Sequence, residues 1–338
     1  MPAIHSHEDG TVLSLVIPIY RSEENIPDLL KAVKDLAHRV ALEAVFVVDG
    51  SPDRSAELLH RELPRQRFLC RLVELTRNFG AFSAITAGMA EGRGDHFAVL
   101  AADLQEPPEL ILDFHKLLST GDCDVVVGQR ISRGDPWLSR TLSGMFWSLF
   151  RRLAVRNIPA GGVDTFACTR QVRDSILALP EVDSSLISLL FWVGYRQQKV
   201  PFVRRQRTAG KSAWSLTKKL NYAIYSLFNF TDVPIRLLIY SGMLAALSSV
   251  VLGAVVLTAK LTGRIPVPGY TAVALLIMFY GGMTMFGLGV VGQYVWLALQ
   301  NARRRPNYII RSSIAFDAPA ARITRDADDS SPNERAET

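Results

Sequence analysis

Cysteine is scarce in this chain: its 338 residues contain three, Cys70, Cys123 and Cys168. They are widely separated and form no Cys-x-x-Cys pair, which argues against a disulfide framework and a zinc site. The N-terminus, MPAIHSHEDG, has no apolar run behind a positive patch. No signal peptide is therefore expected, and the N-terminal domain is predicted to stay in the cytoplasm.

Other familiar signatures are missing too. There is no Gly-x-x-x-x-Gly-Lys-Ser/Thr, no Gly-x-Ser-x-Gly and no His-Glu-x-x-His motif. Their absence disfavours a P-loop, an α/β-hydrolase nucleophile and a zinc protease. The net charge of +6 is modest and does not by itself indicate nucleic acid.

Two long stretches contain no charge at all: Leu237–Ala259, with 23 residues, and Thr271–Leu299, with 29. A helix of ~20 residues crosses a bilayer core of ~30 Å, so each stretch is predicted to span a membrane. The short connector Lys260–Tyr270 predicts a hairpin. More Lys and Arg flank the outer ends of the hairpin than its connector, which predicts cytoplasmic termini. We therefore expect a multi-pass protein of the inner (plasma) membrane.

The first part of the chain alternates short apolar runs with amphipathic stretches. The runs are Val12–Ile19, Ala44–Val48, Leu72–Leu75, Phe97–Ala102 and Val125–Val127. The helix-like stretches between them are Ile26–Arg39, Arg54–Glu62, Phe82–Glu91 and Pro108–Ser119. This alternation predicts βαβ units and an α/β domain with a mostly parallel sheet.

Polar residues follow these runs, where ligands of open α/β sheets bind. Asp49 comes directly after one run and Asp103 after another, followed by Gln105. A carboxylate such as Asp49 suits a base or ribose. Asp103 and Gln105 suit Mg²⁺ or Mn²⁺ bridging a diphosphate, since such cations take oxygen ligands. The structural alternative is a turn after each strand, with Asp53 capping the next helix.

The order of these segments resembles the family-2 glycosyltransferases, in particular the branch acting on polyisoprenyl phosphates. The matching segments are VIPIYRSEENI (16–26), VFVVDGSPD (45–53), LTRNFG (75–80), ADLQEPPEL (102–110), VVGQRISR (126–133) and FWVGYRQQKVPFVRRQRTAGKSAW (191–214). The resemblance covers roughly residues 12–310. It implies a GT-A fold, a divalent cation, Mg²⁺ or Mn²⁺, and inversion at the anomeric carbon.

The resemblance also implies roles for single residues. Contacts to the nucleotide sugar fall to Pro18, Tyr20, Glu23, Asp49, Arg77 and Asp103. Contacts to the acceptor phosphate fall to Arg130, Arg133, Arg207, Lys211 and Ser212. Asp103 and Gln105 are the expected metal ligands. Asp103 and Asp164 are the expected catalytic residues, with Asp164 orienting the acceptor or serving as base.

The expected organisation has five parts. These are an N-terminal tail (1–11), a GT-A catalytic domain (12–212), an amphipathic juxtamembrane region (213–233), the transmembrane hairpin (234–300, spans 237–259 and 271–299) and a basic, then disordered tail (301–338, with disorder from about 312). The glycines of the second span, among them Gly281, Gly282, Gly287, Gly289 and Gly292, are expected at the helix–helix contact.

The expected activity is sugar transfer from a nucleotide-diphosphate donor, UDP rather than GDP, to a polyisoprenyl phosphate such as undecaprenyl phosphate. It would serve cell-envelope glycan synthesis or lipid modification. The expected partners are the donor, the lipid, the membrane and further copies of the chain in a homo-oligomer such as a tetramer, with no nucleic acid. Two alternatives remain. One is a degraded nucleotide-sugar-binding membrane protein, because Ala101 stands where the family usually has an Asp. The other is a related membrane glycosyltransferase with another lipid acceptor.

Overall fold

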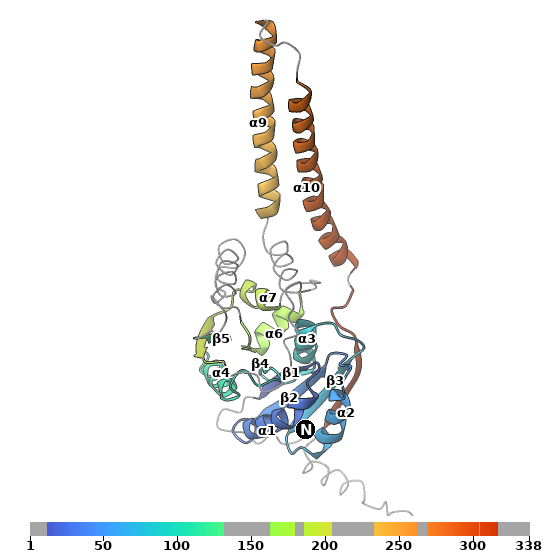
Figure 1. The fold of residues 1–338 in the computed structure, drawn as a ribbon. Helices are drawn as coiled ribbons and strands as arrows, with labels where there is room; N and C mark the ends of the chain where they lie inside the picture. Colours follow the sequence, from blue (N-terminus) through green and yellow to red (C-terminus); the bar gives the residue numbers. More distant parts are fainter. Residues whose placement is uncertain are drawn as a thin grey trace, which may run out of the picture.

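The computed structural model describes residues 12–131, 163–179, 186–204, 233–262, 269–303 and 305–316. Within these ranges, eight strands form one sheet in the order β7-β5-β6-β4-β1-β2-β3-β8 (Figure 1). The strands are β1 Leu13–Ile19, β2 Leu42–Val48, β3 Leu69–Leu75, β4 His96–Val99, β5 Val125–Arg130, β6 Phe166–Thr169, β7 Gln197–Phe202 and β8 Ile310–Phe316. Only β6 and β8 run antiparallel to their neighbours, so the predicted mostly parallel sheet is confirmed.

Helices cover both faces of the sheet, which explains why its strands are nearly continuously apolar. The short helices are α1 Ile26–Ala37, α2 Ser55–Glu62, α3 Ala81–Glu91, α4 Glu109–Ser119, α6 Arg170–Leu177 and α7 Leu186–Trp192, with 3₁₀ turns η1 Glu23–Asn25 and η2 Leu63–Arg65. One buried cluster joins α1, α2 and α4 to one face of the sheet. A second joins α3, α6 and α7 to the other face.

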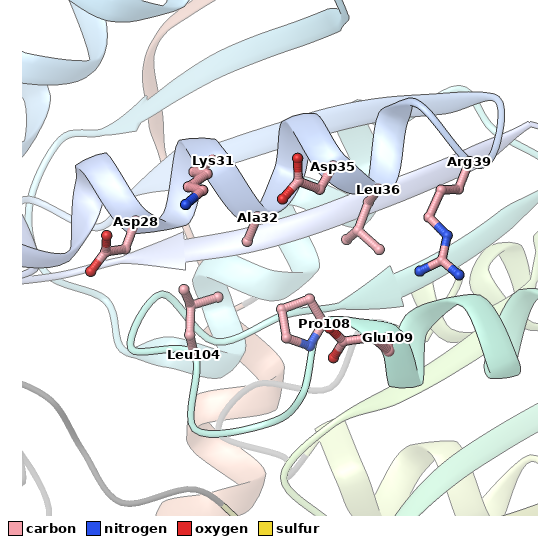
Figure 2. A pocket seen from close by; sticks show the side chains of 9 residues that line it. All are labelled: Asp28, Lys31, Ala32, Asp35, Leu36, Arg39, Leu104, Pro108 and Glu109. Atoms are coloured by element: carbon pink, nitrogen blue, oxygen red, sulfur yellow. The ribbon is translucent and has the colours of Figure 1, made fainter.

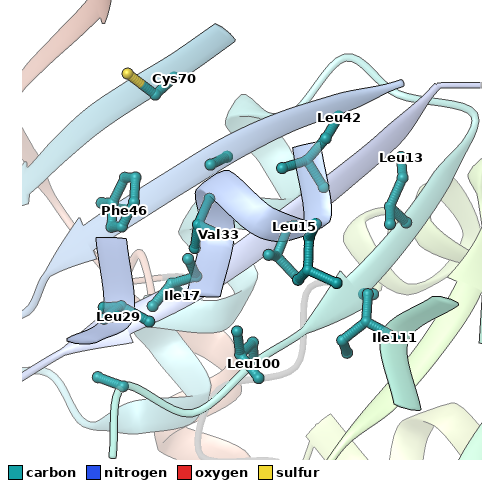
Figure 3. Packing of buried hydrophobic residues seen from close by; sticks show 14 of the residues in the cluster. Leu13, Leu15, Ile17, Leu29, Val33, Leu42, Phe46, Cys70, Leu100 and Ile111 are labelled. Carbon is teal, nitrogen blue, oxygen red and sulfur yellow. The ribbon is translucent and has the colours of Figure 1, made fainter. Parts of the chain in front are cut away.

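The packing of α1 shows how the sequence pattern produces this layer. Leu29 and Val33 lie on the same side of the helix and are fully buried. Figure 3 shows them facing Leu15 and Ile17, two side chains from the same face of β1. Alternate residues of β1 point to opposite faces, and Val16 accordingly belongs to the second cluster.

Two long helices, α9 Val233–Leu261 and α10 Tyr270–Arg303, follow the sheet domain and lie side by side (Figure 1). Their contact includes Gly287, where an added Cβ would lie 3.0 Å from Cδ1 of Leu238. The expected hairpin of helices is therefore present. Among the described residues, one segment, Phe279–Arg303, is long and apolar enough to cross a membrane; Ile235–Leu244 is a shorter apolar one.

The expectation for the other glycines of α10 was wrong. A Cβ added at four of these positions would meet nothing within 4 Å: Gly281, Gly282, Gly289 and Gly292.

The tail also differs from expectation. Disorder was predicted from about residue 312, yet Ile310–Phe316 forms β8 and pairs with β3. Polar contacts fix β8 on both faces of the sheet. Ser312 Oγ donates to Glu74 Oε1 at 3.0 Å, and Ser313 Oγ donates to Glu91 Oε2 at 2.6 Å. The chain therefore returns from α10 to the sheet and completes its edge.

Candidate active site

Asp49 lies at the carboxyl end of β2 and organises the loop that follows β3. Its carboxylate accepts hydrogen bonds from the backbone N–H groups of Phe79 and Gly80, at 2.7 and 2.8 Å. Asn78 Nδ2 donates to the Asp49 carbonyl oxygen at 3.3 Å. The side chain is buried, and this burial raises the pKa of Asp49 against the lowering effect of the two N–H donors. Asp49 thus ties two loops together at the sheet edge where a donor is expected.

Gly50 allows these two loops to touch. Its φ is +53°, and an added Cβ would lie 2.3 Å from the carbonyl carbon of Arg77 and 2.5 Å from the nitrogen of Asn78. Both the left-handed conformation and the backbone contact therefore require glycine.

Replacing Gly50 by Ala is expected to lower the free energy of unfolding by about 3 kcal/mol, combining left-handed strain with overpacking against backbone. Thermal unfolding of the full-length protein measures the loss. Gly121→Ala is the matched control, because Gly121 has φ +74° with nothing within 4 Å of an added Cβ. The free energy of unfolding of Gly121→Ala should fall by about 1 kcal/mol, because this variant has the left-handed strain without the overpacking. Equal losses in the two variants would contradict the role assigned to the loop contact.

A second set of contacts links the loops after β1 and β2. Glu23 Oε2 accepts from the Arg54 N–H at 2.9 Å, and Asp53 Oδ2 accepts from the Glu23 N–H at 3.1 Å. Ser51 Oγ accepts from the Arg21 N–H at 2.7 Å. Asp53 Oδ1 also accepts from the Ser55 N–H at 3.2 Å. The N-cap residue of α2 is Arg54, however, so Asp53 contacts the start of the helix from one position before the cap. These reciprocal bonds hold the loops after β1 and β2 against each other.

The residues expected at the nucleoside come together at this edge. Pro18 lies in β1, and Tyr20 follows β1 with 36% of its surface exposed. The exposed Arg77 places its guanidinium carbon 3.9 Å from the Phe79 ring centroid and donates from Nη1 to the Asn78 carbonyl oxygen. An exposed aromatic ring and an exposed cation thus border the loops that Asp49 and Glu23 hold together.

Asp103 lies in the loop between β4 and α4, at the same edge of the sheet. Leu104 takes a positive φ of 51°, and the Gln105 N–H reaches Asp103 Oδ1 at 3.4 Å. Gln105 is only 8% exposed, whereas Asp103 is partly exposed. Of the two expected metal ligands, Asp103 is therefore the more accessible.

The described residues contain no group of three His, Cys, Asp or Glu side chains placed to hold a metal by themselves. Mg²⁺ usually keeps several waters and binds through one or two carboxylates together with substrate phosphates. Asp103, with Gln105 beside it, fits that pattern. The donor set suits a hard cation that is bound together with a diphosphate and does not suit a site made by protein alone.

On the other side of Asp103 lie two pairs of carboxylate and arginine. Asp164, before β6, accepts from Arg130 Nε at the end of β5. Glu106 Oε1 lies 3.7 Å from Nε of Arg204, two residues beyond β7. Burial, with the nearby Asp164 charge, raises the pKa of Glu106 to about 7; Arg204 opposes the shift and Asp103 adds to it. Three acids and two arginines thus gather around the end of β4.

Sequence reasoning missed Glu106 and gave Arg204 no individual role. Glu106 stands within the 102–110 motif, immediately after Gln105, but its burial and its arginine partner come from segments far along the chain. Arg133, Arg207, Lys211 and Ser212, expected at the acceptor phosphate, lie outside the described residues, as do the 1–11 tail and nearly all of the 213–233 region.

A groove of about 230 Å³ lies between α1 and the loop leading into α4 (Figure 2). Its walls alternate acidic and basic side chains: Asp28, Lys31, Asp35, Arg39 and Glu109. Leu104 also lines it, whereas Asp49, Asp103 and Asp164 do not. The groove is therefore separate from the cluster described above.

The chain is a glycosyltransferase and belongs to the family-2 glycosyltransferases. The model described as "Glycosyl transferase family 2" matches residues 14–178. The sheet is accordingly of the GT-A type.

Several curated relatives match almost end to end. The chain is similar to an uncharacterized glycosyltransferase of Synechocystis, sll0501, at 32% identity over 88% of this chain and 94% of the relative. It is also similar to the bactoprenol glucosyl transferase of Shigella phage SfII, at 31% identity over 89% of this chain and 98% of the relative. Among solved structures, the mannosyltransferase PcManGT from Pyrobaculum calidifontis aligns at 15% identity and a TM-score of 0.43, covering 85% of this chain and 87% of that one.

Proposed function

We propose that this glycosyltransferase moves a sugar, with inversion, from a UDP-sugar to undecaprenyl phosphate at the cytoplasmic face of the membrane. The observation that carries the proposal is one shared sheet edge. It holds the accessible carboxylate Asp103 on one side and the pairs Asp164–Arg130 and Glu106–Arg204 on the other. The relatives named bactoprenol glucosyl transferases support a polyisoprenyl-phosphate acceptor.

The nucleotide would occupy the edge bordered by Pro18, Tyr20 and Arg77, on loops held by Asp49 and Glu23. Asp103 and Gln105 would hold Mg²⁺ or Mn²⁺, which when bound would neutralise charge on the departing nucleoside diphosphate. The acceptor is a phosphate monoester and is already anionic near neutral pH. It needs positioning beside the donor more than it needs a strong base.

The acceptor side would use arginines, which bind phosphate oxygens through two parallel hydrogen bonds. Asp164 would act by holding Arg130 toward the acceptor phosphate. Arg133, Arg207, Lys211 and Ser212 are proposed to add to this site from the basic segments. Helices α9 and α10 would form the transmembrane hairpin, which brings the enzyme to a lipid whose chain cannot leave the bilayer cheaply, at ~0.8 kcal/mol per CH₂ exposed. Assembly as a tetramer is part of the same proposal.

The test incubates purified full-length protein in nanodiscs with undecaprenyl phosphate, Mg²⁺ and a panel of UDP- and GDP-sugars. Mass spectrometry of the lipid fraction should show one glycosyl residue added to the lipid phosphate from a UDP-sugar. EDTA should stop the reaction, and excess Mg²⁺ or Mn²⁺ should restore it. The anomeric configuration of the product, determined by NMR, tests inversion. A wild-type protein that forms no glycolipid with any donor would overturn the proposal.

A further inference from the structure

Glu106 is one of the two most deeply buried acids in the site: like Asp49, it has 2% of its surface exposed. It sits between Gln105 and Pro107, in the loop that carries Asp103. In the described residues its Oε2 atom is buried and has no hydrogen-bond partner. Burying a carboxylate is costly unless it is paired and hydrogen-bonded. Because burying the Glu106 carboxylate is costly, we expect this side chain to have a function in addition to packing.

The cationic partner of Glu106 is Arg204, and their contact is incomplete. Nε of Arg204 lies 3.7 Å from Oε1, close enough for an ion pair but too far for a hydrogen bond. That Nε atom is also buried without a hydrogen-bond partner, although 31% of the side chain is exposed. Glu106 thus attracts one side of the guanidinium, while the rest of the side chain reaches the surface.

The sheet places Arg204 next to Arg130. Strands β5 and β7 are parallel neighbours, and Arg130 stands in register with Phe202. The Ile131 N–H donates to the Phe202 carbonyl oxygen at 3.0 Å, so the pairing continues past the end of β5. Both arginines therefore emerge from the same end of adjacent strands. Each is held by an acid from another loop, Arg130 by Asp164 and Arg204 by Glu106.

We propose that Glu106 is a positioning residue that holds Arg204 beside Arg130, so that the two guanidinium groups together receive the phosphate monoester of the acceptor. The proposal rests on the acceptor class named under Proposed function and adds residues to its site. In this proposal one loop serves both substrates. Asp103 of this loop contacts the donor, and Glu106, three residues later, positions Arg204 for the acceptor.

The test compares steady-state kinetics of full-length Glu106→Gln, Arg204→Gln and the double variant in nanodiscs. Loss of the charge-assisted positioning should raise the KM for undecaprenyl phosphate about tenfold in Glu106→Gln. The donor KM and kcat should change less than about threefold. Arg204→Gln should raise the KM for undecaprenyl phosphate to a similar extent. The double variant should have the same KM as Arg204→Gln, and the two effects should not multiply, because Glu106 acts through Arg204.

Glu57→Gln, an exposed acid on α2, makes the same chemical change outside the site and should leave all constants unchanged. Native mass spectrometry of undecaprenyl phosphate bound without donor gives a second readout, in which Glu106→Gln should bind about tenfold more weakly. An unchanged acceptor KM, a change confined to donor KM or kcat, or multiplied effects in the double variant would each overturn the inference. If the wild type makes no glycolipid, the proposed function fails instead.

Discussion

Replacing Asp103 by Asn is expected to reduce the turnover of glycolipid synthesis by about 100-fold or more, as removal of a preorganised electrostatic group from an active site does. The substitution keeps the size of the side chain and removes its charge. Ala101 supplies no acid beside Asp103, Gln105 is buried, and Glu106, the other acid of the loop, is buried beside Arg204. Little else on the loop can therefore hold a divalent cation in place of Asp103.

Two measurements check this result. The first is kcat at saturating donor and acceptor. The second is Mn²⁺ binding in the presence of UDP, followed by electron paramagnetic resonance, which should weaken in parallel. Asp164→Asn tests the acceptor side and should also reduce turnover strongly, by releasing Arg130, while leaving Mn²⁺ binding intact. Full activity in both variants would refute the site assignment.

Ending the chain after Tyr308 should abolish activity, whereas ending it after Phe316 should not. The shorter chain loses β8, and with it a ladder of backbone hydrogen bonds to β3 worth about 1 kcal/mol each. It also loses the bond from the Thr76 N–H to the Ile309 carbonyl oxygen, at 3.0 Å. Thr76 begins the loop whose N–H groups bind Asp49, so the donor side should loosen first.

The unfolding midpoint of the shorter chain should fall by about 10 °C, since a loss of several kcal/mol lowers the midpoint of a domain this size by 2–4 °C for each kcal/mol. The longer chain, which lacks residues 317–338 alone, is the matched control. Differential scanning fluorimetry and the glycolipid assay distinguish the two. If the chain that ends at Tyr308 keeps its midpoint and its donor KM, β8 does not support the donor loop.

Several elements were predictable because their pattern is local. The expected helix Arg54–Glu62 appears as Ser55–Glu62, and the expected strand Val12–Ile19 appears as Leu13–Ile19. Strand β3 begins at Leu69, three residues before its expected start. Arg71 interrupts the apolar run, yet it is buried between Glu43 and Glu91. The sequence pattern cannot show that a charged residue will find such partners.

Long-range contacts account for the rest. Strand β8 reads IRSSIAF and resembles a polar tail, and its pairing with β3 spans more than 200 residues. The position of Asp49 after β2 was predicted correctly, whereas its engagement by two backbone N–H groups was not. Glu106 was overlooked because its importance depends on Arg204, which lies beyond the end of β7, about 100 residues later in the chain.

The strand order has a mechanical consequence. Strands β7 and β8 are the two outermost strands, and they are also the strands that precede α9 and follow α10 in the chain. Seven interstrand spacings of ~4.8 Å separate β7 from β8 by about 34 Å. Because the chain returns from α10 to β8, the margin of the sheet that β8 forms is tied to the end of the second long helix.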